Sequence, residues 1–342
     1  MPSRVTIHDV ARSAGVSTAT VSNALSGNGR LSSTTRDRVA RIATELGYSA
    51  SPSARGLRTR RVGAIGLYLP RHTVGFEYYM ELAAGAAIEA MGHGLALTLI
   101  PAPDDGRVVR LHVDGVIVSD PVVGDPVLEH LAGLGVPLVT CERDLAPGAA
   151  HAGRVESDHR SATRELLDHL AGGGARRIAV LCPSGETSFG LDIRRAYEEW
   201  SRESGRDPLL HEIPFASRPQ DVRAAVDASL RTATPPDAIV SVTDGGAAST
   251  MHEVLRTGLR VPEDLLVASY VDSRSLCGLT VPVTAVDLRP REMGARAAHL
   301  LADLVAGERP PGAVEVLPIE LVVRASTVRS SAGTKDRDRP ST

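Results

Sequence analysis

The sequence predicts a small all-α head, a short linker and an α/β body built from parallel sheets in two lobes. Three capped, amphipathic stretches within residues 1–48 predict the helices of the head. From Val62 onward, short apolar runs alternate with helical stretches, which is typical of parallel sheets covered by helices. The chain of 342 residues is long enough for two or three domains.

Charge is divided unevenly between the head and the rest of the chain. Residues 1–61 carry ten arginines against Asp9, Asp37 and Glu45, so this segment has a charge of +7. Because the whole chain is at −3, the remainder is at −10. A basic head on an acidic body favours a polyanionic partner for the head alone. The alternative is the solvated surface of a small helical domain.

The three helices of the head begin and end at residues that suit those places. The residues predicted to cap their starts are Thr6, Ser17 and Ser32. Gly15 and Gly47 are predicted to end the first and third helices, because glycine accepts a positive φ. The residues expected to face the core are Ile7, Val10, Ala11, Ala14, Val21, Leu25, Val39, Ile42 and Leu46.

These helices predict a helix-turn-helix unit completed by a third helix. The second helix, "TATVSNAL", holds no charged side chain although it lies in the most basic part of the chain. Short Thr, Ala, Ser and Asn side chains allow such a helix to approach base edges in the major groove of DNA. Phosphates would be contacted from outside this helix, by Arg30, Arg36, Arg38 and Arg41. The alternative is a surface helix whose low charge is accidental.

The head contains the stretches "VTIHDVARSAGVSTATVSNALSG" and "LSSTTRDRVARIATELGYSASPSARGLRTRR", and the body contains "VGAIGLYLP", "VDGVIV", "GLRVPEDLLVASY" and "VLPIELVVRAST". In these stretches the sequence resembles the LacI/GalR repressors. The resemblance implies a dimeric repressor that binds a palindromic DNA operator, with an activator as the alternative. It assigns base reading to Thr18, Ala19 and Asn23. The other DNA-binding residues that it implies are Thr6, Ser17, Thr20, Ser22, Arg30, Ser32, Thr35, Tyr48, Ser51, Ala54, Arg55 and Leu57.

The linker at residues 49–61 has the signals of a short helix. Ser51 can cap it and Pro52 suits its first position, but a helix of about two turns is marginal alone. The resemblance implies a hinge helix that folds on DNA and pairs with that of the partner subunit. Leu57, with Ala54 beside it, would then wedge into the minor groove. A plain basic linker is the alternative.

The body is predicted to form two lobes of the periplasmic-binding-protein kind. The first covers residues 62–158 plus about 287–318, and the second covers 159–286 plus about 319–329. Residues 330–342 are polar and predicted to be disordered. The runs predicted as strands are "VGAIGLYL", "LALTLI", "VDGVIVS", "PLVTC", "RIAVLC", "AIVSV", "LLVASY" and "TAVDL". The crossover before "VDGVIV" is short for a helix, so that edge of the first lobe is expected to be less covered.

Ligands of open α/β sheets bind at the carboxyl ends of strands, which in a two-lobed body means the cleft. The residues predicted to line it are Phe76, Tyr78, Tyr79, Asp158, Phe215 and Asp244. By the resemblance, Ile193 stands where sugar-binding relatives often have Arg, and Val271, followed by Asp272, stands where they often have Asp. Without those charged groups a simple hexose would lack hydrogen-bond partners. A less polar effector, or a body that acts without one, is expected.

Other function classes find little support in the sequence. The chain has no GxSxG elbow, P-loop or HExxH motif, so no enzyme is predicted. The eleven histidines are scattered, "GHG" at residues 92–94 is typical of a turn, and the three cysteines are far apart, so neither a metal nor a cofactor is expected. The N-terminus lacks a signal peptide and no apolar run could span a membrane. These patterns favour a reduced, cytoplasmic protein over an exported solute-binding protein.

Overall fold

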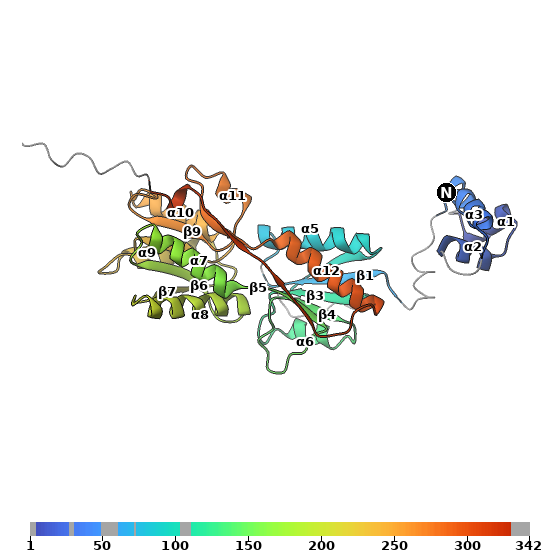
Figure 1. Ribbon diagram of the computed structural model, residues 1–342, viewed down its shortest axis with the longest axis horizontal. Coiled ribbons are helices and arrows are strands. Elements are labelled where there is room, and N and C mark those ends of the chain that lie inside the picture. The colour runs from blue at the N-terminus through green and yellow to red at the C-terminus, as the bar shows by residue number, and fades with distance from the viewer. Residues whose placement is uncertain (1–4, 27–30, 49–60, 72, 103–110, 330–342) are drawn as a thin grey trace, which may run out of the picture. The chain divides into compact units, whose positions relative to one another are not determined.

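The computed structural model describes residues 5–26, 31–48, 61–71, 73–102 and 111–329 (Figure 1). These residues belong to two compact units. One unit ends at Gly63 and contains the helical head, and the other begins at Ala64 and contains the α/β body.

The head consists of three helices around a small apolar core. They are α1 Ile7–Ala14, α2 Thr18–Ser26 and α3 Ser33–Glu45. The buried core residues are Val10, Ala11, Ala14, Val21, Ala24, Val39 and Ala43. The prediction that Leu46 is buried is wrong: α3 ends at Glu45, Leu46 is 36% exposed, and Ala43 faces the core instead.

The predicted starts of the three head helices and the predicted end of the first helix are confirmed. Gly15 follows α1 with φ of 64°, a conformation that glycine adopts without a Cβ clash. At each helix start a backbone N–H donates to a nearby side-chain oxygen. These bonds join Thr6 N to Asp9 Oδ2 (2.9 Å), Thr20 N to Ser17 Oγ (3.1 Å) and Thr35 N to Ser32 Oγ (3.2 Å).

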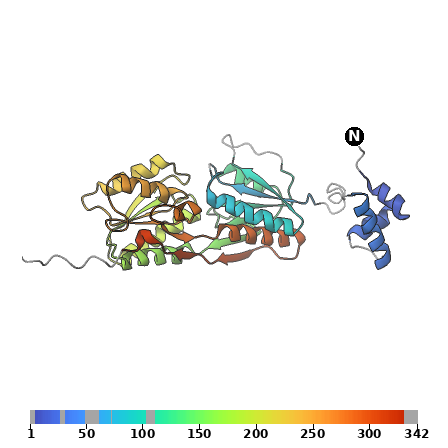
Figure 2. The same ribbon diagram turned by 90° about the horizontal axis from the view of Figure 1, so that it is seen from above.

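The first lobe of the body is built on a six-stranded sheet of order β11-β5-β4-β3-β1-β2, in which neighbouring strands are parallel. The strands are β1 Ala64–Leu69, β2 Ala96–Pro101, β3 Gly115–Ser119, β4 Leu138–Cys141, β5 Gly153–Ser157 and β11 Ala313–Leu317. Helices α5 (Glu77–Gly92) and α12 (Pro290–Ala306) pack side by side on one face (Figures 1 and 2). Helix α6 (Pro126–Ala132) packs on the other face.

The second lobe repeats this plan with a sheet of order β12-β10-β9-β8-β6-β7. Its strands are β6 Ile178–Pro183, β7 Leu209–Ile213, β8 Ala238–Ser241, β9 Leu266–Ser269, β10 Thr284–Asp287 and β12 Glu320–Val322. Strand β12 is antiparallel to β10, and the other pairs are parallel. The helices around this sheet are α7 His159–Gly172, α8 Ser188–Glu203, α9 Pro219–Leu230, α10 Gly246–Arg256, the short α11 Arg274–Cys277 and the 3-10 turn η1 Ala325–Thr327.

Each sheet begins with the doubly wound order 2-1-3-4-5, counted along its own lobe. The chain passes between the sheets after β5, after β10 and after β11. The predicted two-lobed α/β fold with parallel sheets is therefore confirmed. Within the described residues, no helix combines the length and apolar character needed to cross a membrane.

Four strands, three of them at sheet edges, were not predicted from the sequence. All eight apolar runs predicted as strands form strands, but β5, β7, β11 and β12 were not predicted. In β5, partly exposed Arg154 and Glu156 alternate with buried residues, so it lacks the apolar run of a strand buried on both faces. Strands β7, β11 and β12 lie at sheet edges and are also only partly buried.

The edge of the first lobe is sparsely covered at β2. Of its six residues only Ile100 is buried, and Leu99 is 46% exposed. Between β2 and β3 the described residues contain no helix, and residues 103–110 of the short crossover lie outside them. The linker at 49–60 and the tail at 330–342 also lie outside the described residues.

Candidate nucleic-acid interface and ligand pocket

Helix α2 presents short uncharged side chains on its outer surface. Val21 and Ala24 are buried in the head core and Leu25 packs against it, which leaves the polar side chains and Ala19 on the outer surface of the helix. The exposed or partly exposed side chains are Thr18, Ala19, Thr20, Ser22, Asn23 and Leu25. Such a surface allows the helix backbone to come close to the edges of base pairs.

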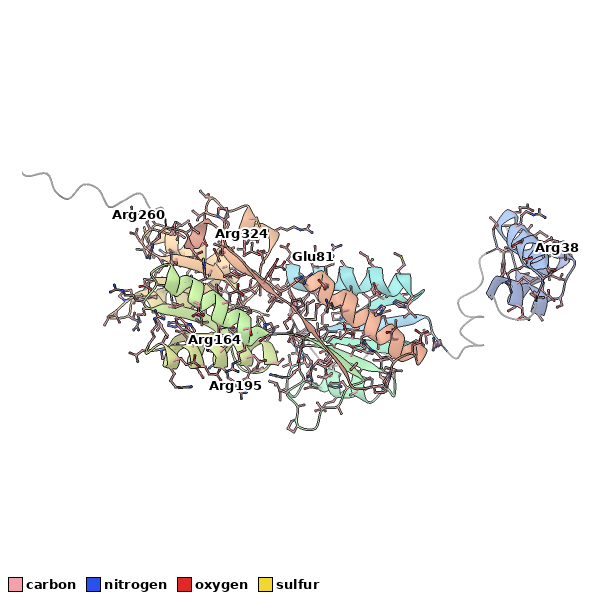
Figure 3. All side chains as sticks on the ribbon, in the orientation of Figure 1. Arg38, Glu81, Arg164, Arg195, Arg260 and Arg324 are labelled. Atoms are coloured by element: carbon pink, nitrogen blue, oxygen red, sulfur yellow. The ribbon has the colours of Figure 1, made fainter. Side chains whose placement is uncertain are left out.

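The arginines predicted to contact phosphates have different surroundings in α3. Arg38 is exposed on the surface of the head (Figure 3). Arg41 Nη1 donates to Glu45 Oε1 over 2.9 Å, and both side chains are largely exposed. The Nε atom of Arg36 is buried. The predicted DNA contacts Arg30, Ser51, Ala54, Arg55 and Leu57 lie outside the described residues.

Several of the residues predicted to contact DNA also stabilise helix ends. The Thr6 hydroxyl donates to Asp9 Oδ2 over 2.7 Å. Tyr48 packs against the head core, and its backbone N–H donates to the Ala43 carbonyl over 2.8 Å. The hydroxyl pairs Ser17–Thr20 (2.9 Å) and Ser32–Thr35 (2.8 Å) lie at the starts of α2 and α3. Helix starts present backbone N–H groups that favour anions, so these positions suit phosphate contacts as well as capping.

A pocket in the body lies where strands of both sheets end. The residues that line it are Phe76, Tyr78, Tyr79, Asp120, Glu142, His159, Phe189, Phe215, Thr243, Asp244, Val271 and Leu288. Asp120, Glu142 and Leu288 directly follow β3, β4 and β10, as expected for a doubly wound sheet. The predicted residues that the structure brings together here are Phe76, Tyr78, Tyr79, Phe215, Asp244 and Val271.

Three residues predicted to contact an effector do not line this pocket. Ile193 is 1% exposed in the apolar core of the second lobe, because its position on α8 faces the sheet. Asp158 caps α7, and its Oδ1 accepts the Ser161 N–H over 3.0 Å. Asp272 forms a bidentate ion pair with Arg324 (Figure 3), with Nη1–Oδ1 at 2.8 Å and Nη2–Oδ2 at 2.6 Å. Ile193, Asp158 and Asp272 therefore lie outside this pocket, and their role in binding an effector stays a prediction.

The pocket also contains a buried polar cluster that was not predicted from the sequence. Tyr79 Oη donates to Asp120 Oδ2 over 2.8 Å, and His159 Nε2 lies 3.3 Å from Glu142 Oε1. Asp120 and Glu142 have φ of 43° and 72°, a conformation that costs free energy for residues other than glycine. Both carboxylates directly follow predicted strands, which is the signal that could have found them.

Burial shifts the protonation of this cluster. The pKa of Asp120 rises to about 7, first because the carboxyl is buried and second because Glu142 repels its charge, while Tyr79 and His159 partly oppose the rise. For His159, burial alone would lower the pKa, but attraction to Glu142 and Asp120 outweighs burial and raises it. Asp120 and His159 therefore hold protons more strongly than the same groups in water, and the carboxyl oxygens of the cluster favour a ligand that donates hydrogen bonds.

Direct bonds between the lobes surround the pocket. Arg143 of the first lobe places Nη2 2.8 Å from both carboxylate oxygens of Asp192 in α8. The Tyr78 N–H donates to Asp244 Oδ2 over 3.1 Å, and Arg274 Nη2 donates to Glu81 Oε1 over 2.9 Å; Glu81 lies on α5 (Figure 3). In this arrangement the free volume of the cavity is about 30 Å³, room for about two water molecules.

Two protein families match parts of this chain. Residues 6–51 match "Bacterial regulatory proteins, lacI family", and residues 167–327 match "Periplasmic binding protein-like domain". The HTH-type transcriptional regulator CelR of Thermobifida fusca is 28% identical over 334 residues, covering 94% of this chain and 98% of that protein. The ribose operon repressor of Bacillus subtilis is also 28% identical, with the same coverage of the two chains.

Solved structures show the same fold. The complex of the transcriptional regulator CelR with cellobiose has a TM-score of 0.71 at 27% identity, covering 94% of this chain and 100% of that one. The lac repressor dimer bound to operator has a TM-score of 0.79 at 22% identity, with 96% and 100% covered, and supports the fold alone. The relatives are transcriptional regulators. The chain therefore joins a DNA-binding domain of the lacI family to a periplasmic-binding-protein-like domain, and its homologues are transcriptional regulators of the LacI/GalR type.

Proposed function

We propose that the chain is a homodimeric repressor that binds a palindromic operator in the cytoplasm and responds to a small molecule in the pocket between its lobes. The observation that supports this most is the joining of two parts in one chain: an uncharged, outward-facing α2 and a pocket lined by strand-end residues from both sheets. Two heads related by twofold symmetry would read the two halves of a palindrome. The pocket would bind its ligand without transforming it, so no enzymatic activity is proposed.

The proposed base contacts are Thr18, Ala19 and Asn23 on α2. Asn can pair with adenine, and the methyl groups of Ala and Thr can contact the thymine methyl. Phosphates would be contacted by exposed Arg38 and by the capped starts of α2 and α3. Leu57 is proposed as a minor-groove wedge at the centre of the site.

Selection of bound duplexes from random DNA with the full-length chain tests the DNA half of the proposal. A palindrome is expected, and Asn23→Ala should weaken the selected site about 5- to 150-fold while leaving random DNA little changed. Arg38→Ala is the matched control, because loss of a phosphate contact should weaken selected and random DNA alike. Leu57→Ala should behave like Asn23→Ala. Enrichment without twofold symmetry would contradict the dimeric arrangement.

The proposed effector is a small molecule with several hydrogen-bond donors. Asp120, Glu142 and Asp244 supply acceptors, and the aromatic rings of Phe76 and Phe215 supply apolar walls. The cellobiose complex of CelR makes sugars the first class to test, although Ile193 and Val271 leave two positions without charged groups.

Thermal unfolding with glucose, ribose, cellobiose and a small alkylamine tests the ligand half. A ligand of the pocket should raise the melting temperature, and Glu142→Gln should abolish the rise. Asp158→Asn is the matched control, because Asp158 caps α7 and does not line the pocket. If operator binding proceeds unchanged with every compound, the second candidate gains support. It is a regulator whose body acts without an effector, and the small cavity and the direct bonds between the lobes favour it.

A further inference from the structure

On the surface of the first lobe, three side chains that could bind a metal ion converge from two helices. Glu89 lies in the last turn of α5, His93 directly follows that helix, and His299 lies on α12. His93 Nε2 is 3.1 Å from Glu89 Oε1, His299 Nδ1 is 2.9 Å from the same oxygen, and the two nitrogens are 3.2 Å apart. We propose that Glu89, His93 and His299 bind one divalent transition-metal ion of the zinc class.

Protons alone cannot satisfy the three contacts. If both imidazole nitrogens donate to Glu89 Oε1, each carries a hydrogen, and the contact of 3.2 Å between the two nitrogens is left without a hydrogen bond. If only one nitrogen carries a hydrogen, the lone pair of the other nitrogen can accept it, but that nitrogen then faces the carboxylate oxygen with no hydrogen between them. A cation bound by all three atoms removes this conflict, because each atom then donates a lone pair to it.

The three ligand atoms are spaced nearly as three corners of a tetrahedron around a metal ion would be. Zinc bonds to His and Glu of about 2.0–2.2 Å place neighbouring ligand atoms of a tetrahedron about 3.3–3.5 Å apart. The distances of 2.9–3.2 Å need to widen by only a few tenths of an ångström. Two imidazoles with one carboxylate favour zinc, nickel, cobalt or iron over calcium and magnesium, which prefer oxygen.

The surroundings leave room for a fourth ligand. The side chains of Glu89, His93 and His299 are 34%, 32% and 53% exposed, so a water molecule can complete the coordination. Asp303 Oδ2 lies 3.7 Å from Nε2 of His299, the nitrogen that faces away from the cluster. A carboxylate at that position helps to fix the ring orientation of a ligating histidine.

Close packing of α5 against α12 holds the three side chains in register. Where the helices cross, a Cβ on Gly85 would lie 1.9 Å from the Arg291 carbonyl oxygen, and one on Gly294 would lie 2.0 Å from the Leu82 carbonyl oxygen. Such backbone contact fixes the helices relative to one another. Glu89 is one turn beyond Gly85, and His299 is five residues beyond Gly294, so the rigid crossing determines the separation of the ligands. The site therefore needs little ordering when it binds an ion.

Calorimetric titration of zinc chloride into untagged, full-length protein freed of metal tests the proposal. We expect one ion per chain, with a rise in melting temperature when zinc is present. His93→Gln and His299→Gln should each weaken zinc binding at least about tenfold, since even the loss of a group that only orients a metal ligand lowers metal affinity by about 10–100-fold. His130→Gln, an exposed helical histidine of the same lobe, is the matched control and should change nothing.

A cobalt titration identifies the ligands. Bound cobalt absorbs visible light with an intensity set by its coordination, and Glu89→Gln should change that spectrum while circular dichroism shows the fold retained. Cys277→Ser excludes capture of the ion by the exposed cysteine and should leave binding intact. Zinc binding that survives the double variant His93→Gln/His299→Gln, or no binding by the unaltered protein, would overturn the proposal.

Discussion

Replacing Asp120 by Asn tests the electrostatics of the pocket. Asp120 is buried beside Glu142, with Tyr79 donating to its carboxylate. Asn keeps the size of the side chain and an oxygen for Tyr79, and it tolerates the φ of 43° better than most residues. The substitution therefore removes a buried negative charge with little change in packing.

The expected change in stability follows from the pKa of Asp120. For a carboxylic acid whose pKa is raised by folding, the native state binds a proton more tightly than the unfolded chain, so stability falls as the pH rises between the two values. The rise for Asp120, from 3.8 to about 7, corresponds to a cost of about 4 kcal/mol above pH 7. The raised pKa of His159 also makes stability fall as the pH rises. The protonated histidine stabilises the fold at low pH, and that contribution is lost as the pH rises through the pKa of the folded state.

Asp120→Asn should therefore stabilise the body at about pH 8.5 and have little effect, or a slightly unfavourable one, at about pH 5. We expect a gain of about 2 kcal/mol at the higher pH, since the buried amide NH₂ of Asn costs part of the difference. Urea unfolding followed by the fluorescence of Trp200, the single tryptophan, reports on the body. Asp207→Asn, at an exposed aspartate of the second lobe, is the control. Equal effects of Asp120→Asn at both pH values would refute the reasoning.

The remaining predictions concern packing and the contacts between the lobes. Gly85→Ala should destabilise the body by about 3 kcal/mol or more in urea unfolding, because the added Cβ meets backbone; Gly92→Ala, with open space around it, should be neutral or slightly stabilising. Ile193→Ala should cost about 2–4 kcal/mol and leave ligand affinity unchanged if Ile193 is a core residue. A double-mutant cycle on Arg143 and Asp192, which are partly exposed, should give a coupling of about 0.5–1 kcal/mol.

The head could be predicted almost residue by residue because its signals are local. Ser17 and Ser32 cap helices through bonds to residues three positions later, and Gly15 ends a helix through its own φ. The failure at Leu46 is also local: the helix ends one residue earlier, and the last residues turn outward. Interactions within one helical turn depend on sequence spacing alone, which is why they can be predicted from it.

The pocket could be predicted only in part because its residues come from many strand ends. The rule that ligands lie at the carboxyl ends of strands correctly located Phe76, Phe215 and Asp244. It could not place Ile193, since the side of α8 that faces the sheet depends on how the helix packs. The approach of His93 to His299 arises from the α5–α12 crossing, and 206 residues separate the two histidines in the chain.

The size of the cavity constrains how a ligand would act through the proposed pocket. Small-molecule sites usually occupy about 300–1,000 Å³, far more than the free volume of about 30 Å³ in this pocket. A sugar-sized ligand that enters this pocket must therefore bind an arrangement in which contacts such as Arg143–Asp192 are stretched or broken. Such a ligand shifts the population away from the closed arrangement, in which the contacts between the lobes are intact. It changes operator binding only to the extent that the closed and open arrangements differ in their affinity for DNA. Weakening the contact with Arg143→Ala should then raise ligand affinity, whereas a ligand that stabilises closure would bind this variant less tightly.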